Sequence, residues 1–512
     1  MTRNLVAGVA TLLFAAFTIG LDLTGVLLLT ASIENEFTVD ITTTQWVLNL
    51  YALTYAVLMI TGGRLGDMYG RRRMMLIATG LFAVASIGCL FAPTIGWLIA
   101  ARGVQGAGAA MMWPSILAIG ANLVPAERRG WIMGLILAGV TSGNVFGPLI
   151  GGFVAWVGDW RLFFLVNLMM AIVVALLVLR FLPKDPPETA GQRVDVVGIA
   201  LLAGAVGALL YGLDVGPDWG WASLAIVGIF VLSAVLFVLF PLAEHRVADP
   251  MVPPPLMQNR DFLLALTTNG LLVPSIFLAF LYFPQYFQKV LGWSVLAASF
   301  GMLPLMVLLS VGAILAGRLY DSIGPRRLLL AGYVLIALGG AWIVVLPSGW
   351  GYVAMVPAMV LIGLGGAMGV GSAGTVAVSA VAPTRTGVAG GLSFTVHLAC
   401  GAVGVAGGTA ILYLSSTQTL QRGLSEAGIA VTPADQATLN AAAPGADATA
   451  RILGTFTTET ATAIQNLMTT SFAQGLSHAY WLALGAALVG LVCVIAIDEK
   501  KLKNADAAAP KT

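Results

Sequence analysis

One acidic and one basic side chain stand alone inside long apolar stretches of this sequence. Asp22 lies in the first stretch and Arg102 in the fourth, and Asp22 is the one acid that the sequence places securely within such a stretch. A charge in the hydrocarbon core of a bilayer is costly unless it is paired, protonated or in contact with water. Two interpretations follow for Asp22: a proton site whose occupancy responds to its surroundings, or half of a structural ion pair.

The depths of the two residues would allow them to meet. At a rise of about 1.5 Å per residue, Asp22 lies roughly 20 to 25 Å from the start of its helix, and Arg102 lies roughly 10 Å from the start of a helix that runs the opposite way. Arginine keeps its proton at any accessible pH. We therefore predict that Arg102 tunes the proton occupancy of Asp22. The alternative is that Arg102 only satisfies backbone carbonyl groups.

The composition requires a bilayer as solvent and excludes several classes of protein. Hydrophobic residues make up 59% of the 512 positions and charged residues only 9%, with a mean hydropathy of +0.93. A formal charge of +2 without basic runs argues against nucleic acid as a partner. Three scattered cysteines and three histidines offer no metal cluster and no nucleophile with a base. We expect neither an enzyme nor a metal or cofactor.

The sequence contains fourteen apolar stretches of about 18 residues or more, each able to cross a bilayer as a helix. They cover residues 6–30, 46–63, 74–92, 96–122, 131–155, 162–182, 196–214, 221–241, 262–283, 295–317, 328–346, 352–379, 388–413 and 476–497. An even number of spans puts both termini on one side, and 20 of the 25 Lys and Arg residues fall there. Because positive residues concentrate on the cytoplasmic side, we predict a multi-pass protein of the inner membrane with both termini cytoplasmic.

A polar segment at residues 63–73 recurs at residues 317–327. Gly, Arg, Leu, Asp, Gly, Arg and Arg stand at matched positions in both copies, which predicts two related halves. The copies begin 254 residues apart, more than six spans usually need, so two spans are expected between the halves. The predicted domains are a six-helix half (1–195), two inserted helices (196–241), a cytoplasmic linker (242–261), a second six-helix half (262–497) and a cytoplasmic tail (498–512). Within the second half, residues 414–475 are expected to form an extracytoplasmic surface hairpin or partly ordered cap.

These motifs resemble those of the major facilitator superfamily, and within it the fourteen-span drug:proton antiporters. The repeated polar segment resembles the loop signature of the family. The run Leu21-Asp22-Leu23-Thr24 is similar to its first-helix motif, and residues 102–110 resemble the fourth-helix motif of proton-coupled members. The resemblance implies an all-α integral membrane protein with the major facilitator fold, built from two six-helix halves plus two inserted helices.

The fifth-helix antiporter motif is matched in full, by Gly134, Gly143, Gly147, Pro148, Gly151 and Gly152. Glycines allow helices to approach closely, and a proline bends its helix. We expect a tight, pliable contact between the halves that suppresses proton leak. The alternative is ordinary glycine-rich packing.

The two polar repeats are predicted to hold the cytoplasmic side closed. A carboxylate is favoured near a helix N-terminus, and the thirteenth span begins near Thr386. We expect Asp67 to cap that helix while Arg71 and Arg72 balance the charge; the alternative is an anchor that only fixes topology. The predicted gating residues are Gly63, Asp67, Gly70, Arg71, Arg72, Gly317, Asp321 and Arg326.

Polar, aromatic and thioether side chains of several spans are predicted to line a substrate cavity: Tyr51, Thr54, Tyr55, Gln105, Met112, Trp113, Asn144, Thr268 and Asn269. Such groups with a single acid suit an amphipathic molecule that is neutral or singly cationic. The aromatic cluster of Tyr282, Phe283, Tyr286 and Phe287 is interpreted as an interfacial belt. His397 is interpreted as a hydrogen-bonded interior residue.

The sequence thus predicts a monomeric, proton-coupled antiporter that exports lipophilic neutral or monocationic drugs by alternating access. Its expected partners are protons, a small amphipathic substrate and the lipid bilayer. One alternative is an exporter of a single endogenous amphiphile, such as a lipid or secondary metabolite. A second, of another class, is a transport-deficient membrane sensor or scaffold.

Overall fold

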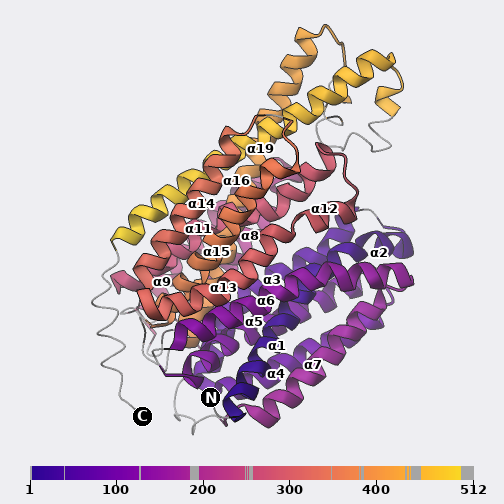
Figure 1. Cartoon of the computed structure of the whole chain (residues 1–512). Helices are drawn as coiled ribbons and strands as arrows, with labels where there is room; N and C mark the ends of the chain where they lie inside the picture. The colour runs from indigo at the N-terminus through magenta and orange to yellow at the C-terminus, as the bar shows by residue number, and fades with distance from the viewer. Residues whose placement is uncertain are drawn as a thin grey trace.

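The part of the chain that the computed structural model describes is built from helices and contains no strand. It comprises residues 3–39, 41–125, 128–184, 195–247, 250, 252, 256, 258–347, 349–379, 381, 386–432, 435–436, 439 and 451–496. Fourteen helices of 20 to 41 residues dominate it (Figure 1): α1 (Arg3–Gly25), α3 (Ile41–Tyr69), α4 (Arg71–Leu90), α5 (Ile95–Leu123), α6 (Arg129–Val157), α7 (Arg161–Phe181), α8 (Val196–Trp219), α9 (Leu224–Glu244), α11 (Arg260–Lys289), α13 (Leu303–Ile323), α14 (Pro325–Val345), α15 (Tyr352–Ser379), α16 (Thr386–Glu426) and α19 (Thr458–Ile495). The short elements η1 (Val26–Leu29), α2 (Thr30–Phe37) and α12 (Val295–Gly301) connect them.

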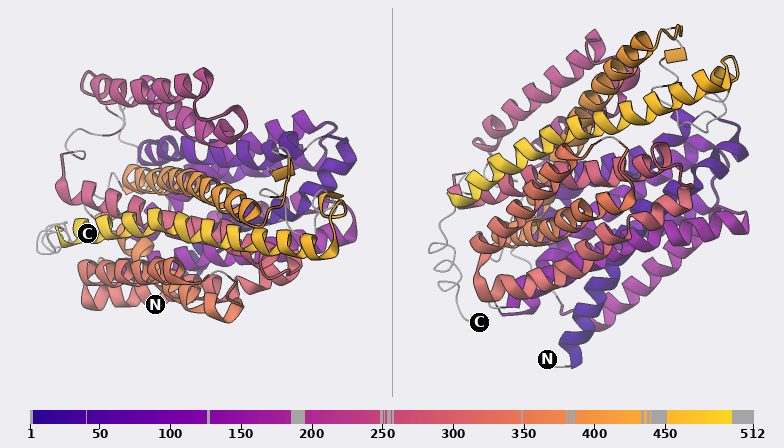
Figure 2. Two further views of the ribbon diagram at one scale, coloured as in Figure 1. Left: turned by 90° about the horizontal axis from the view of Figure 1, so that it is seen from above. Right: turned by 45° about the horizontal axis from the view of Figure 1, so that its top comes forward.

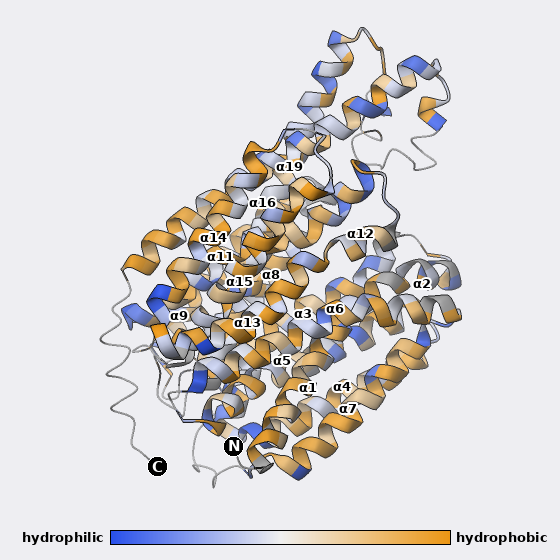
Figure 3. Ribbon diagram, viewed as in Figure 1, coloured by the Kyte–Doolittle hydropathy of each residue, from blue (hydrophilic) through white to orange (hydrophobic). Residues whose placement is uncertain are grey.

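Thirteen of these helices are long and apolar enough to cross a membrane, counted over the described residues. The fourteenth, α8, has a shorter apolar segment, Val197–Leu213. The first predicted span, 6–30, is shorter as a regular helix than expected, because α1 ends at Gly25 and the chain tightens into the 3₁₀ turn η1. Hydrophobic residues cover the helices along the bundle, and hydrophilic residues gather toward its ends (Figure 3).

Two helix groups lie side by side in the bundle. Helices α1 and α3–α7 pack on one another, as do α11, α13–α16 and α19, and the two groups meet where α6 contacts α13 and α3 contacts α16. Helices α8 and α9 pack together, and α8 rests against α3 and α16 where the groups meet (Figure 2). Helix α9 buries only 11% of its apolar window, which suits a helix that faces lipid on most sides.

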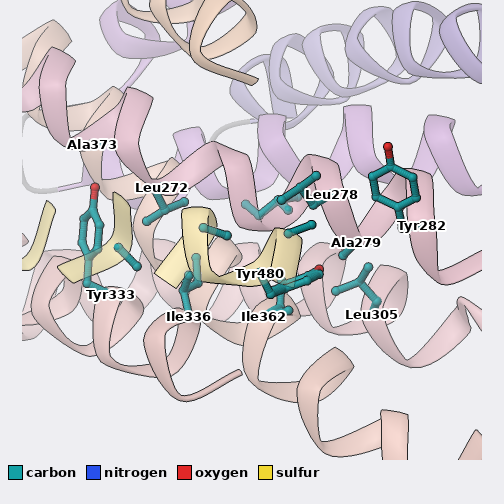
Figure 4. Close-up of a cluster of buried hydrophobic side chains, with 14 of the residues drawn as sticks. Leu272, Leu278, Ala279, Tyr282, Leu305, Tyr333, Ile336, Ile362, Ala373 and Tyr480 are labelled. Atoms are coloured by element: carbon teal, nitrogen blue, oxygen red, sulfur yellow. The ribbon is translucent and has the colours of Figure 1, made fainter. Parts of the chain in front are cut away.

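The core of the second group is aromatic, and it corrects one expectation. Tyr282, Phe283, Tyr286 and Phe287 on α11 are all at most 4% exposed, so they do not form an interfacial belt. Phe283 stacks on Tyr480. Figure 4 shows Tyr480 among other side chains of this core, including Ile336, Ile362 and Leu305. The reason is that α15, α16 and α19 pack against α11 and shield it from lipid.

Helices α16 and α19 continue far past the bundle. They have 41 and 38 residues, about twice the length that a bilayer requires. Their extensions pack on a small core that includes Leu420, Leu453 and Ile464, and together they project from one end of the molecule (Figure 1). The helix therefore runs on at Leu414, where the sequence predicted that a loop begins, because polar residues change the solvent of a helix without ending it.

The two copies of the polar repeat form the same tight turn. Gly70 joins α3 to α4 with φ of 94°, and Gly324 joins α13 to α14 with φ of 88°. Side chains with a Cβ rarely adopt this conformation. Both repeats therefore have a glycine at this position, because the chain must reverse there without strain.

Candidate functional site

Asp22 and Arg102 form a fully buried ion pair. Arg102 Nη1 lies 2.9 Å from both carboxylate oxygens of Asp22, and both residues are 0% exposed. Asp22 is carried near the end of α1 and Arg102 near the start of α5, so the antiparallel helices bring them to one depth. The sequence-based estimate of similar depths is confirmed.

Three other helices of the first group add hydrogen bonds around the pair. Arg102 donates to Gln105 Oε1 at 2.7 Å and, through Nε, to the carbonyl of Val47 on α3 at 3.1 Å. Asn167 on α7 donates to Asp22, and Gln105 donates to Ser86 on α4 at 2.9 Å. Such hydrogen bonding is what makes a buried ion pair tolerable in a low-dielectric interior.

The guanidinium of Arg102 also stacks on an aromatic ring. Its Cζ lies 4.1 Å from the centroid of Tyr51 and 5.9 Å from that of Phe164. A cation over a ring face is attracted by the ring quadrupole, and more strongly when both are desolvated. The ring of Tyr51 is therefore in direct contact with the cation of the pair.

Thr24, in the same first-helix motif as Asp22, compensates for a proline in α6. Pro148 has no N–H, so the carbonyl of Asn144, four residues earlier, loses its helical partner. The hydroxyl of Thr24 lies 3.0 Å from that carbonyl and donates to it. The first-helix and fifth-helix motifs are thus physically one contact.

The glycines of the antiporter motif serve two different contacts, which corrects the expectation of one contact between the halves. A Cβ on Gly143, Gly147 or Gly151 would lie 2.8 Å or less from the backbone of α1 in the same half. A Cβ on Gly134 would lie 2.3 Å from the carbonyl of Ala313 on α13, in the other half. The physical reason is helix periodicity: a four-residue spacing keeps glycines on one face, and the nine residues between Gly134 and Gly143 turn the helix to the opposite face. Pro148 and Gly152 lie in the same α6 helix.

Asp67 links the two halves at the turn of the first polar repeat. Its Oδ2 accepts a hydrogen bond from the N–H of Val388 at 3.0 Å, in the first turn of α16, and Arg71 pairs with its Oδ1 at 3.1 Å. Its side chain is 2% exposed. The predicted contact between Asp67 and the start of the thirteenth span is present. Gly63 is buried in α3 on the same side.

Arg72 and Arg326 occupy equivalent places in the two halves. Arg72 donates to the carbonyl of Leu179 at 2.8 Å, near the end of α7, and Arg326 donates to that of Ile495 at 2.9 Å, at the end of α19. Each arginine thereby satisfies carbonyls that a helix end leaves unpaired. Gly317 lies against Gly130 of α6, where a Cβ would lie 2.5 Å from a carbonyl. Asp321 belongs to α13, and its side chain lies outside the described residues.

A small cavity of about 50 Å³ lies between the two halves. Its walls come from α5 and α6 on one side and α11, α15 and α16 on the other: Trp113, Leu117, Met133, Leu137, Asn269, Val370, Gly371, Gly374, Thr375, Gly390, Ser393, Phe394 and His397. None of these lining residues is a carboxylate. Arg102 and Trp113 are both on α5, and the 11 residues between them correspond to about 16 Å. The ion pair is therefore not part of the cavity wall.

Of the residues predicted to line a cavity, Trp113 and Asn269 do so here. Gln105 belongs to the ion-pair cluster, and Tyr51 and Tyr55 stack on each other beside it. The others lie within helix contacts: the Thr54 and Thr268 hydroxyls bond to carbonyls of their own helices, Met112 is fully buried, and the Asn144 carbonyl meets Thr24. Polarity within a span therefore did not distinguish a cavity wall from a helix contact.

His397 and Phe394 are two of the lining residues that were not predicted from the sequence. His397 is 9% exposed, and its Nδ1 lies 3.3 Å from Asn269 Oδ1, which agrees with a hydrogen-bonded interior residue. Phe394 stacks on His397, with centroids 5.1 Å apart. The available signal was their three-residue spacing on one helix, which places both on the same face.

A second ion pair lies at the end of the first helix group that is opposite the polar repeat. Glu36 on α2 pairs with Arg161 at 2.7 Å and accepts a hydrogen bond from Trp160 Nε1 at 2.7 Å. The slight burial of Glu36 acts to raise its pKa, but the hydrogen bonds from Arg161 and Trp160 and the charge of Arg161 outweigh it and lower the pKa below 4.5. Arg161 also bonds to the carbonyl of Ala92 at 3.2 Å, so the contact joins α2, α7 and the turn after α4.

Comparison with known proteins identifies the family to which this chain belongs. The family model of the Major Facilitator Superfamily matches residues 12–196 and 194–405, one match for each helix group. The chain belongs to the major facilitator superfamily. It is accordingly a multi-pass membrane transporter for small substrates, not an enzyme, and its fold is the major facilitator fold.

Several relatives within the superfamily carry names of resistance proteins. The chain is 33% identical to "Multidrug resistance protein Stp" of Mycobacterium tuberculosis, over 70% of this chain and 67% of that protein. It is 32% identical to "Puromycin resistance protein pur8" of Streptomyces alboniger, over 78% and 80% of the two chains. It is 31% identical to "Tetracenomycin C resistance and export protein" of Streptomyces glaucescens, over 76% and 72%.

Solved structures agree on the fold. The human organic anion transporter MFSD10 superimposes with a TM-score of 0.63 at 14% identity, covering 96% of this chain and 100% of that one. The proton:xylose symporter XylE gives a TM-score of 0.62 at 14% identity, covering 99% of each chain.

Proposed function

We propose that this transporter exports lipophilic neutral or monocationic molecules in exchange for protons, by alternating access. The observation that carries the proposal is the fully buried Asp22–Arg102 pair within the first half. Arg102 keeps its charge at any accessible pH, so Asp22 is the member of the pair that exchanges a proton. A buried carboxylate next to one cation takes up a proton when the contact with that cation is weakened.

The cavity between the halves is the proposed substrate site. It presents aromatic, thioether and amide groups, with Trp113, Met133 and Asn269 among them. Such a wall suits flat amphipathic molecules. The named compounds of two relatives, puromycin and tetracenomycin C, support export of antibiotics of this kind.

The proposed orientation places both termini and both polar repeats in the cytoplasm of a bacterial-type inner membrane. The bias of Lys and Arg toward that side supports it. Protons then enter down their gradient, with about 2.3 kcal/mol per 100 mV of membrane potential for each charge moved. The contact of Asp67 with α16 holds the cytoplasmic side closed in this proposal, and the protein works as a monomer.

Export of one endogenous amphiphile is the second candidate. It is favoured by the fact that two of the relatives are named for a single compound each. Profiling of many compounds in the same vesicles separates the two candidates: a multidrug exporter accumulates many chemical classes, and a dedicated exporter one.

Uptake of ethidium into inverted membrane vesicles tests the proposal. An imposed gradient, acidic inside, is expected to drive accumulation by the wild type, and Asp22→Asn is expected to fall to the level of vesicles without the transporter. Glu36→Gln, which changes an exposed carboxylate outside the spans, serves as the matched control and is expected to transport normally at neutral pH. Wild-type accumulation by Asp22→Asn would contradict proton exchange at Asp22 and would favour a sensor, a scaffold or another coupling site.

A further inference from the structure

A continuous line of aromatic rings joins the buried ion pair to the cavity. The Arg102 guanidinium lies on the ring of Tyr51, and Tyr51 stacks on Tyr55 with centroids 6.0 Å apart. Tyr55 meets the edge of Phe394 at 6.1 Å. Phe394 in turn lies 4.9 Å from Trp113 and 5.1 Å from His397, both on the cavity wall.

This line crosses from one half of the molecule to the other. Tyr51 and Tyr55 are four residues apart on α3, so they lie on one face of that helix, while Phe394 belongs to α16. The backbones of α3 and α16 are close at this point. Thr395 Oγ1 donates a hydrogen bond to the carbonyl of Ala56 at 3.4 Å, and a Cβ on Gly391 would lie 2.9 Å from the carbonyl oxygen of Met59. Tyr51 and Tyr55 are at most 2% exposed. These two rings are closed off from solvent, so a displacement of Phe394 toward Tyr55 is passed on to Tyr51.

We propose that Tyr55 and Phe394 are positioning residues that couple occupancy of the cavity to the protonation of Asp22. A molecule in the cavity contacts Phe394, and the ring line carries its displacement to Tyr51 and the Arg102 guanidinium. Protonation of Asp22 acts in the reverse direction, because it removes the countercharge of Arg102 and strengthens the hold of the cation on Tyr51. Thermodynamic linkage requires both directions to have the same magnitude. The inference rests on the proposed function, since it presupposes that Asp22 exchanges a proton.

Few other groups around Asp22 could account for a pH dependence. Among the side chains that the structure describes, the ionisable neighbours of Asp22 are Arg102 on α5, Tyr51 on α3 and Cys89 on α4. Helix α7 presents Asn167, and α6 has no ionisable side chain after Arg129 at its start. His397 on α16, which stacks on Phe394 and lines the cavity, is a further titratable group along the ring line, and Asp22→Asn separates its contribution from that of Asp22.

Ethidium binding to the purified full-length protein, followed by fluorescence anisotropy between pH 5.5 and 8.5, tests the coupling. In the wild type the apparent Kd is expected to weaken about tenfold from the basic to the acidic end, within the 5- to 150-fold range usual for coupled sites. In Tyr55→Leu and in Phe394→Leu the change with pH is expected to fall below about twofold. Tyr55→Phe keeps the ring and is expected to restore it.

The matched control is Phe277→Leu, which removes another ring in contact with His397, at 5.7 Å, that is not in line with Arg102. It is expected to keep the pH dependence. The double variant Tyr55→Leu/Phe394→Leu is expected to resemble each single variant, because both interrupt one line. A merely structural role would weaken binding equally at every pH and would leave the tenfold change intact, and that result overturns the inference.

Asp22→Asn separates this inference from the proposed function. If Asp22→Asn keeps the wild-type pH dependence, the proposed function fails, and the inference fails with it. If Asp22→Asn abolishes the pH dependence and the two leucine variants keep it, only the coupling through the rings is wrong. Melting temperatures of all variants identify any variant that is unfolded. If Tyr55→Leu on α3 is unfolded, Phe394→Leu on α16 supplies the measurement, and the reverse holds as well.

Discussion

At the scale of single residues, each motif side chain has one physical task that the structure defines. Asp22 and Arg102 form an ion pair, and Thr24 donates the hydrogen bond that the Asn144 carbonyl loses to Pro148. Asp67 accepts a hydrogen bond from an N–H in the first turn of α16. Unpaired polar groups cost most where water is absent. The motifs therefore concentrate where the backbone or a charge would otherwise stay unsatisfied.

Thr24→Val is expected to destabilise the protein by about 1 kcal/mol, because hydrogen bonds between membrane helices contribute about 0.6 kcal/mol on average and up to about 1.7. Valine has the shape of threonine but cannot donate to the Asn144 carbonyl. Denaturant unfolding in detergent measures the loss. Thr24→Ser, which keeps the hydroxyl, is the control, and equal stability of Thr24→Val and wild type would show that the contact contributes nothing.

The ion pair between Glu36 and Arg161 makes the stability of the folded protein depend on pH. The folded-state pKa of Glu36 is lowered below 4.5, so its contribution is fully present above pH 4.5 and is lost as the pH falls through the lowered value. The melting temperature of the wild type is therefore expected to fall more steeply below pH 4.5 than that of Glu36→Gln. Parallel pH profiles for the two proteins would contradict this assignment.

At the scale of helices, the sequence predicted which long helices are present better than it predicted where each helix ends. Hydropathy identified all fourteen long helices of the described residues, but α16 and α19 extend well beyond their apolar parts. The ion pair could be predicted because two charges at one depth have few other solutions in a bilayer. The cavity wall could not, because residues such as Thr54 and Trp113 are equally polar or aromatic on either face of a helix, and only packing decides which face meets the cavity.

Contacts between helices also differ between the two halves. The pairing of Arg72 and Arg326 with the last helix of each half is duplicated, whereas the ion pair is not. Among the described residues of α15, which occupies the place of α5, no charged side chain is present. Among the described residues the buried charge pair thus lies in the first half, and the second half contributes the larger share of the cavity wall.

Gly151→Ala is expected to cost about 1 to 3 kcal/mol, the usual range for overpacking, because its Cβ would lie 2.2 Å from the carbonyl of Gly25. Gly228→Ala on α9 has no atom within 4 Å of the new Cβ and is expected to be neutral or slightly stabilising. Thermal unfolding of both variants in one detergent makes the comparison. A Gly151→Ala protein as stable as Gly228→Ala would mean that α1 and α6 can separate without loss.

At the scale of the whole molecule, the structure is closed at the end that carries both polar repeats. There α3 meets α16 through Asp67, and α6 meets α13 where Gly130 approaches Gly317. Alternating access requires these contacts to break when that end opens. The same opening would part Tyr55 from Phe394, so the ring line is complete only in the closed form.

Asp67→Asn is expected to shift the distribution of conformations toward opening at this end. The substitution removes the charge that favours the α16 N-terminus, about 0.3 to 1 kcal/mol, and the partner of Arg71. Spin-label distances between the ends of α3 and α16 measure the shift. The conservative Asp67→Glu is the control, and an unchanged distribution in Asp67→Asn would remove the gating role from this residue.

Measurement of proton flux through reconstituted liposomes tests whether the buried Asp22–Arg102 pair carries the exchanged proton. Liposomes are loaded with ethidium and a pH-sensitive dye and then diluted, so that outward movement of ethidium drives protons inward. We predict acidification of the lumen by the wild type and none above empty liposomes by Asp22→Asn. Acidification by Asp22→Asn at the wild-type rate would contradict the account, because the proton would then travel by a route that does not include the buried pair.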